Sequence, residues 1–252
     1  MREFLVFHLH GPMASWGDTA VGEYRPTHDH PTRSAVLGLV GAALGIRREE
    51  EERLTALADG YSVAIRLDRP GTLLRDYHTT QVPRSGTGRR RREFTTRREE
   101  LGAPDKDIST ILSSRDYHCD AVYTACLWSR TDQPSYRLEE LRDALNAPTF
   151  VLYLGRKSCP PALPLGAKVV AGENLGAVFA TEPFPGGGLL PHLVPRERTV
   201  RVYWEGDEDV GIRPDHSGPR HDDPLSRKRW QFRDRIEHYG VVERSGEDTA
   251  CT

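Results

Sequence analysis

The order of apolar segments is the feature that most constrains how this chain folds. Short apolar runs of strand character alternate with runs of helical periodicity, and clusters of glycine, proline and polar residues separate them. In chain order, the patterns predict a strand, two helices, three strands, a helix and a strand. Their expected ranges are 3–10, 35–44, 50–58, 61–67, 72–78, 120–128, 138–145 and 149–154.

Without the extra hairpin strand over 72–78, and with the two successive helices counted as one helical segment, this order is strand, helix, strand, strand, helix, strand. We therefore predict an α+β fold of the ferredoxin-like type, which is also the scaffold of the RRM. The first helix is expected to start at Thr32, whose hydroxyl can cap free amides. Gly38, Gly41 and Gly45 fall in that helix, and each costs about 1 kcal/mol relative to alanine. Close packing of the helix on a sheet is the expected compensation.

Residues 79–114 interrupt the pattern, because they are polar and have too little apolar content for a core. Long insertions of this kind are usually functional or disordered. The whole chain has a net charge of -2, yet seven arginines and one acid lie between Arg84 and Arg98. The tetrapeptide Arg-Asp-Tyr-His occurs on both sides, at 75–78 and 115–118. Either this is chance, or the two copies lie at the feet of a projecting hairpin; a solvated mobile loop is the alternative to such a hairpin.

The domain organisation follows from these segments. The chain has 252 residues, of which 37% are hydrophobic, enough for one large domain or two small ones. We predict an α+β domain over 1–155, with a thumb inserted at about 79–114, and a small β-rich C-terminal region over 156–252. No apolar run approaches the roughly 20 residues that span a bilayer, so a soluble cytoplasmic protein is expected. The four cysteines fit neither a disulfide scaffold nor a zinc motif.

Two segments have the composition of a phosphate site. The first is Pro31-Thr32-Arg33-Ser34, where backbone amides, hydroxyls and Arg33 favour an anion, although an ordinary capped helix has the same sequence. The second is a glycine turn with two cations at 154–160, which lacks the spacing of a Walker loop. This turn suits the approach of an RNA phosphate, and it equally suits the plain end of a strand.

Candidates for catalysis are few. His28-Asp29-His30 lacks a third placed ligand, so we expect no metal and no cofactor, and surface positions for the two histidines. A metal-free ribonuclease would use His78 or His118 as a general base, with Lys157 or an arginine to stabilise the phosphate in the transition state. That activity is an alternative to simple binding.

A series of short motifs runs in order over most of residues 1–165. The motifs are Gly11-Pro12-Met13-Ala14-Ser15-Trp16-Gly17, Arg25-Pro26-Thr27, Pro31-Thr32-Arg33-Ser34, the segment 38–46, Arg75-Asp76-Tyr77-His78-Thr79, Cys119-Asp120-Ala121 and the segment 153–160. In these motifs the chain resembles the fifth Cas protein family of RAMP-type RNA binders, in the branch found in type I-E CRISPR Cascade complexes. The last third of the chain matches more loosely, through Asp222-Asp223-Pro224 and Trp230-Gln231-Phe232.

The resemblance implies a ferredoxin-like domain that grips the 5′ handle of the CRISPR RNA and caps the Cascade backbone. Its thumb would insert against the neighbouring backbone subunit, the Cascade large subunit that reads the PAM would dock nearby, and target DNA would be reached only through the complex. A separate subunit cuts the precursor RNA in type I-E systems, so the implied role is non-catalytic, whereas type I-C relatives cut RNA. A protein-interaction module without RNA contact is a third hypothesis.

We expect arginines to bind phosphates and aromatic side chains to stack on bases. Trp16 is the preferred stacking residue, and its packing under the thumb is the alternative. The expected RNA-binding residues are Met13, Ser15, Trp16, Arg25, Thr32, Arg33, Ser34, Tyr77, His78, Arg89, Arg90, Arg91, Arg92, Arg115, Tyr117, Gly155, Arg156, Lys157 and Ser158.

Overall fold

The computed structural model describes residues 1–18, 20–83, 95–102, 108–184, 191–194, 199–206 and 208–244. Its body is a mixed α/β structure on a seven-stranded sheet, in which every neighbouring pair of strands is antiparallel. In order across the sheet, the strands are β10 (Lys168–Gly172), β1 (Arg2–His10), β9 (Val122–Ser129), β6 (Tyr61–Arg69), β11 (Thr199–Glu205), β13 (Gln231–Glu243) and β12 (His216–Ser226). The helices of the body are α1 (Arg33–Ala43), α2 (Glu51–Gly60), α4 (Leu138–Asn146) and α5 (Leu175–Thr181), with a 3-10 turn, η2, at Pro191–Leu193.

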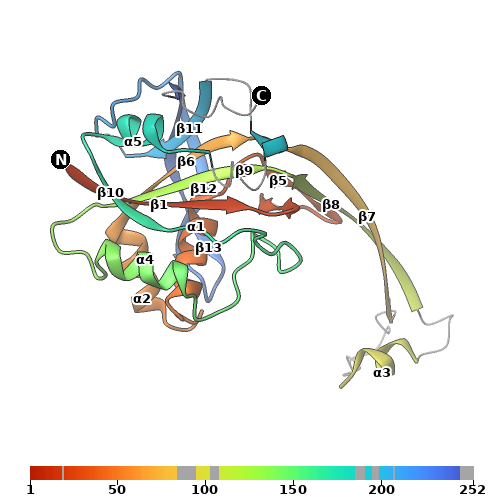
Figure 1. Ribbon diagram of the computed structural model, residues 1–252. Helices are drawn as coiled ribbons and strands as arrows, with labels where there is room; N and C mark the ends of the chain where they lie inside the picture. The colour runs from red at the N-terminus through yellow and green to blue at the C-terminus, as the bar shows by residue number, and fades with distance from the viewer. Residues whose placement is uncertain are drawn as a thin grey trace.

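Helices cover both faces of the sheet. Figure 1 shows α1, α2 and α4 on one side and α5 on the other. Side chains of a strand alternate between the two faces. In β1, Leu5, Phe7 and Leu9 join the core under α1, α2 and α4, whereas Phe4 and Val6 join the core under α5. Because both faces of β1 are covered, its sequence is apolar from Phe4 to Phe7 and again at Leu9.

The elements predicted up to residue 146 are all present, most of them with small shifts at their ends; the strand predicted over 72–78 continues to Pro83, and the strand predicted over 149–154 is wrong. Leu152 and Leu154 are buried there without joining the sheet. The Leu154 amide donates instead to the Cys159 carbonyl (2.7 Å), which closes a local loop. The strand that follows α4 in the sheet is β10, and its approach is fixed by the Asn146 side chain, which bonds the backbone N–H and C=O of Ala167 (both 2.9 Å).

The cost of the three glycines predicted in this helix is not offset by close packing on a sheet, as was expected. Each glycine has a different neighbour. An added Cβ at Gly38 would lie 3.0 Å from Nη1 of Arg227, so this glycine makes room for a guanidinium. Gly41 faces Leu54 and Leu57 of α2, and it lets the two helices pack closely. Gly45, with φ +73°, lies just past the helix in the left-handed conformation that favours glycine. The predicted cap is confirmed, since Thr32 Oγ1 accepts from the Ala35 amide (3.1 Å).

A long curved hairpin projects from the body (Figure 1). It consists of β7 (Thr72–Pro83) and β8 (Ile108–Cys119), and the short helix α3 (Arg97–Leu101) lies at its far end. The repeated tetrapeptides lie side by side in it, as the hairpin hypothesis expects, with Arg75 opposite Asp116 and Asp76 opposite Arg115. The arginines at 84 and 89–92 lie outside the described residues. At the foot of the hairpin are the short strands β2 (Met13–Ala14), β3 (Trp16–Gly17), β4 (Tyr24–Arg25) and β5 (Thr27–His28).

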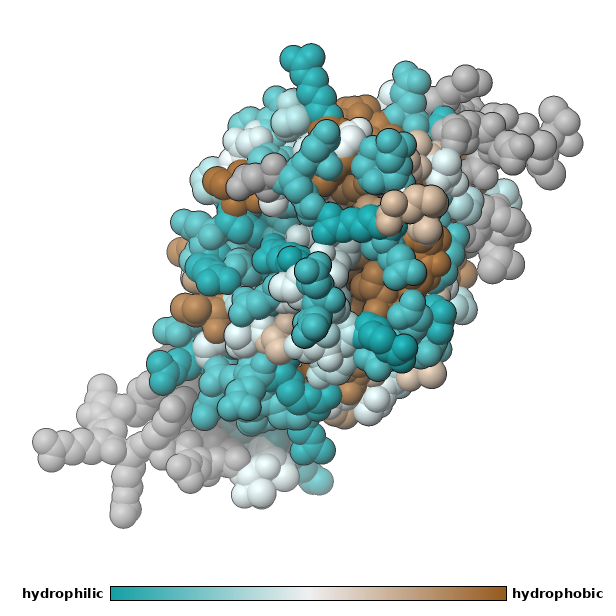
Figure 2. Space-filling view, turned by 90° about the vertical axis from the view of Figure 1, so that its left-hand side faces the viewer, coloured by the Kyte–Doolittle hydropathy of each residue, from teal (hydrophilic) through white to brown (hydrophobic). Residues whose placement is uncertain are grey.

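The C-terminal region does not form a sheet of its own. β10, β11, β13 and β12 all lie beyond the predicted boundary at residue 155, and they extend the sheet of β1, β9 and β6 at both edges. On the side away from the hairpin, hydrophilic residues make up most of the surface and hydrophobic ones form separate patches (Figure 2). No helix in the described part of the chain is long and apolar enough to cross a membrane.

Candidate nucleic-acid interface

The foot of the hairpin is a junction of several segments, with Asp116 at its centre. Both β2 and β4 pair with β8 there. The Asp116 carboxylate accepts hydrogen bonds from Arg75 Nε (2.8 Å) and from the Tyr24 hydroxyl (2.5 Å), and the Asp116 carbonyl accepts from Ser15 Oγ (2.9 Å). The bond from Arg75 lowers the pKa of Asp116, which favours its charged form. Thus the Arg of one tetrapeptide copy binds the Asp of the other, and together they fix the foot.

The predicted glycine turn packs directly on this foot. Gly155 has φ +84°, and an added Cβ would lie 1.8 Å from the Ser15 carbonyl oxygen, so only glycine permits the contact. The guanidinium of the next residue, Arg156, lies 4.7 Å from the centre of the Tyr117 ring and donates to the Asp116 carbonyl (3.2 Å). The cation–π contact holds the Arg156 side chain against the foot.

A groove of about 580 Å³ lies next to the turn, between α1, the segment 151–155 and the β12–β13 hairpin. Three of the expected RNA-binding residues line it: Thr32, Ser34 and Gly155. The cations and aromatic rings of its wall have no RNA role among the residues expected from the sequence. These are Arg48, Tyr153, Arg227, Trp230 and Phe232.

Trp230 is the most unusual residue of the groove, since its φ of 56° is rare for a bulky side chain and 60% of it is exposed. The Arg48 guanidinium lies 5.0 Å from the centre of its ring, and the Phe232 ring meets it edge-on at 5.5 Å. Nearby, Arg227 donates to the Ser34 carbonyl. Burial lowers the pKa of Arg227 to about 10, and the charge of Arg48 adds to the effect.

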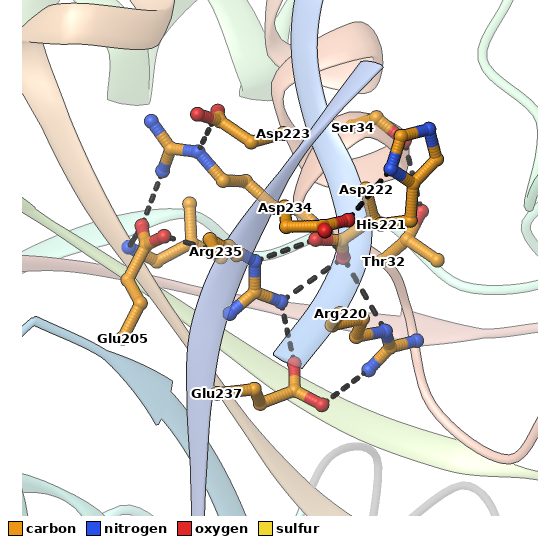
Figure 3. A network of polar contacts seen from close by, with 12 residues as sticks. Thr32, Ser34, Glu205, Arg220, His221, Asp222, Asp223, Asp234, Arg235 and Glu237 are labelled. Atoms are coloured by element: carbon orange, nitrogen blue, oxygen red, sulfur yellow. Dashed lines mark hydrogen bonds and ion pairs between the residues drawn. The ribbon is translucent and has the colours of Figure 1, made fainter. Parts of the chain in front are cut away.

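Asp222, which lines the groove, belongs to a buried ion-pair network on β12 and β13 (Figure 3). It accepts from Arg235 Nε (2.6 Å) and from the backbone amide of Arg33 (2.8 Å). Glu237 accepts from Arg235 Nη2 (2.5 Å) and Arg220 Nη1 (2.7 Å). The network ties the C-terminal hairpin to the start of α1, and so it holds two walls of the groove together.

The structure corrects two of the expected RNA contacts. Arg33 is 1% exposed, and its guanidinium donates to Asp223 Oδ1 (2.8 Å) and to Glu205, so it is a structural cation inside the protein. Trp16 is also 1% exposed, and its ring lies edge-on to Tyr123 at 5.5 Å in the main core. No base can stack on a ring that is already enclosed, so Trp16 is a core residue in this structure.

The other expected contacts differ in exposure. Ser15, Thr32 and Tyr117 are buried, at 1%, 4% and 6% exposed, and of these three only Thr32 lines the groove. Half-buried residues are Met13, Ser34, Arg115 and Arg156, and exposed ones are Arg25, Tyr77, His78, Gly155, Lys157 and Ser158. Arg89, Arg90, Arg91 and Arg92 lie outside the described residues, and their predicted role is a proposal.

The histidine pair also differs from the expectation of two surface residues. His30 is 5% exposed, its ring stacks on Tyr203 at 3.6 Å, and its nitrogens lie 2.6 Å from Asp29 Oδ1 and 3.1 Å from Glu237 Oε1. It is therefore part of the buried network. Among the described residues, no three His, Cys, Asp or Glu side chains are grouped to hold a metal ion.

The network makes stability sensitive to acid. Burial raises the pKa values of Asp29, Asp223 and Glu237, but hydrogen bonds and charges from His30 and arginines outweigh it, so all three pKa values are lowered, that of Asp29 to about 2. Carboxylates with lowered folded pKa values stabilise the protein above their unfolded pKa of about 4 and lose this contribution as the pH falls further. We expect the melting temperature, followed by circular dichroism, to fall between about pH 4 and pH 2. Glu237→Gln should weaken that dependence; identical profiles for both proteins would contradict the assignment.

Comparisons with known proteins agree with this architecture. A solved chain of a CRISPR RNA-guided surveillance complex superposes with a TM-score of 0.65 at 26% identity, over 96% of this chain and 90% of that one. The crystal structure of a Cas protein gives a TM-score of 0.61 at 24% identity, over 96% and 95% of the two chains, and shows the same fold. The fold is thus that of a CRISPR-associated protein.

Sequence comparison identifies the family. The model of the family described as CRISPR-associated protein (Cas_Cas5) matches residues 4–236, so the chain belongs to this family. The CRISPR system Cascade subunit CasD of Escherichia coli (strain K12) is 38% identical over 173 residues, which cover 66% of this chain and 70% of that protein. The family resemblance predicted from the short motifs is confirmed.

Proposed function

We propose that the chain is the non-catalytic subunit that grips the 5′ handle of the CRISPR RNA in a type I-E Cascade complex of the cytoplasm. The observation that supports this best is the convergence of Thr32, Ser34 and Gly155, from separate segments, on one groove beside the hairpin. The exposed cations Arg25 and Lys157 lie at the foot of the hairpin, next to that groove. Phosphate contacts of this kind position an RNA, and contacts to bases select it.

We further propose that the body contains a ferredoxin-like unit of the RAMP type. Its support is the strand order β10-β1-β9-β6, with α1 and α2 between β1 and β6 and with α4 between β9 and β10. In the proposed organisation this unit lies within residues 1–155 except for its last strand, β10, which comes from the C-terminal region of residues 156–252. The hairpin that contains the insertion at about 79–114 is its thumb. Because strands from both parts hydrogen-bond to one another in one sheet, we expect the two parts to fold together.

The hairpin has a second proposed role, as the contact to a neighbouring Cascade backbone subunit. Its support is a set of apolar side chains that are 37–65% exposed: Leu73, Leu74, Tyr77, Ile111 and Leu112. Exposed apolar groups of this density favour protein contact. In this proposal the Cascade large subunit docks near the chain, and target DNA is reached only through the complex.

A third hypothesis is that the chain is a protein-interaction module without RNA contact. In that case, binding to a partner subunit would be the same before and after nuclease treatment.

The salt dependence of RNA binding tests the phosphate contacts. For a single strand, log affinity falls with log salt concentration by about 0.7 for each phosphate contact. We expect joint replacement of Arg89, Arg90, Arg91 and Arg92 by alanine to flatten the slope by about 0.7 for each lost contact, measured by fluorescence anisotropy with labelled repeat RNA. Arg142→Ala, on the exposed side of α4, is the matched control. An unchanged slope in the four-residue variant would contradict a phosphate role for the cluster.

The alternative function is a metal-independent endoribonuclease that processes repeat RNA. One observation favours it: burial lowers the pKa of His118, so the neutral ring that a general base requires is favoured near neutral pH. The test is incubation of repeat RNA with the purified chain in EDTA. The non-catalytic proposal predicts intact RNA, and clean cleavage that is lost in His118→Ala or His78→Ala would establish the alternative.

A further inference from the structure

We propose that the groove between α1 and the β12–β13 hairpin binds one unpaired nucleotide of the RNA, with its base on Trp230 and its phosphate at Arg48 and Arg227. This inference rests on the proposed RNA-binding function and assigns the nucleotide contacts within it.

Trp230 has the geometry of a stacking platform. A φ of 56° is costly for a bulky residue, and a side chain that is 60% exposed gains little burial in return. Arg48 lies over its ring and Phe232 contacts its edge, so the ring is oriented without being enclosed. Stacking of a base on such a ring contributes about 1–3 kcal/mol to RNA binding. This contribution would explain why an exposed tryptophan is kept in a strained backbone conformation.

Arg227 provides the anion site. The α1 backbone holds its guanidinium, through the hydrogen bond to the Ser34 carbonyl and through the absence of a side chain at Gly38. The positive charge of Arg48 acts unfavourably on the Arg227 guanidinium, and both residues line the groove. A phosphate that contacts both cations would offset this repulsion.

The size and the remaining lining of the groove fit a nucleotide. Its volume of about 580 Å³ lies within the range of small-molecule sites. Tyr153, 41% exposed, provides another aromatic ring, and the hydroxyls of Thr32 and Ser34, 3.1 Å apart, offer hydrogen-bonding groups. The carboxylates of Asp18 and Asp222 also line the groove; Asp222 is paired with Arg235 (2.6 Å), and Asp18 lies 3.4 Å from His28 Nε2.

This combination favours RNA over an acidic peptide as the occupant. An acidic peptide needs cations alone, whereas the groove places its cations beside exposed aromatic rings, the pairing by which proteins bind unpaired bases. The groove also meets the turn at Gly155, so an RNA strand on the foot of the hairpin would reach it without a gap.

The decisive variant is Trp230→Gly in the full chain. Glycine adopts a positive φ without strain, so the melting temperature should stay equal or rise, while the affinity for single-stranded repeat RNA should fall about tenfold. Trp230→Phe should keep most of the affinity because a ring is retained. Arg227→Gln should weaken binding and reduce the salt slope by about 0.7. Arg142→Gln is the control cation and should change neither quantity.

The readouts are fluorescence anisotropy with labelled repeat RNA, the melting temperature, and the RNA and subunit content of the complex that co-purifies with each variant. Wild-type affinity in both Trp230→Gly and Arg227→Gln would overturn the inference and leave the proposed function intact. If the complex of a variant lost a partner subunit but kept its RNA, the inference would also be overturned, because the groove would then bind a peptide segment of that subunit. Absence of RNA binding by the wild-type chain and its complex would overturn the proposed function itself.

Discussion

We expect that replacing Arg33 by methionine will lower the free energy of unfolding by about 3–5 kcal/mol, the cost of leaving buried charges without their buried partner. Arg33 is 1% exposed and donates to Asp223 and Glu205, which are themselves 7% and 2% exposed. It also donates to the Tyr61 carbonyl (3.0 Å). Urea unfolding followed by circular dichroism measures the loss.

Two further variants make this result specific. Arg142→Met removes an exposed ion pair with Asp143 and should leave the free energy of unfolding nearly unchanged. Adding Glu205→Gln to Arg33→Met should recover part of the loss, because without Arg33 the buried Glu205 keeps mainly Arg130, whose side chain is 34% exposed, and one excess negative charge is then removed. If Arg33→Met were as stable as Arg142→Met, the buried network would not hold the C-terminal hairpin to α1.

Gly155→Ala is the second substitution with a large expected effect. The left-handed backbone at φ +84° costs alanine roughly 1–2 kcal/mol, and the new methyl group would also collide with the Ser15 carbonyl oxygen, 1.8 Å from the Cβ position. We therefore expect a loss of more than about 2 kcal/mol in unfolding free energy, together with weaker RNA binding, because the turn can no longer pack on the foot of the hairpin.

Gly166→Ala is the matched control. Gly166 also has a positive φ, +57°, but an added Cβ would only reach ordinary contact with His8, at 3.7 Å. It should lose roughly 1–2 kcal/mol for the backbone conformation and keep normal RNA binding. Equal losses in the two variants would mean that the contact between Gly155 and Ser15 does not matter.

Most of the fold could be predicted because the apolar pattern of each element reflects what covers it. β1 is apolar throughout since both of its faces are covered, and α1 begins at Thr32 since that hydroxyl caps it. The false strand at 149–154 shows the limit of this reasoning. Leu152 and Leu154 are apolar because they are buried, but their backbone bonds locally and not to the sheet.

The candidate site was less predictable because it depends on long-range contacts. Arg33 has a favourable residue type and position for an anion, yet its partners Asp223 and Glu205 lie far away in sequence, and no local pattern shows that they enclose it. The groove was equally hard to predict. Arg48 and Trp230 are far apart in sequence, and their contact depends on the position of the β12–β13 hairpin in the sheet. The two polar tetrapeptides could be paired because repetition marked them in the sequence.

The most direct test of the central claim, that this chain binds the guide RNA inside a multisubunit complex, is a co-purification. The tagged chain is expressed with its genomic neighbours, the complex is purified at moderate salt, and its RNA is extracted and sequenced. We predict a small RNA of defined length with a repeat-derived 5′ end, recovered together with several copies of a backbone subunit. A complex of the same subunits without a discrete RNA, or the chain alone, would contradict the claim.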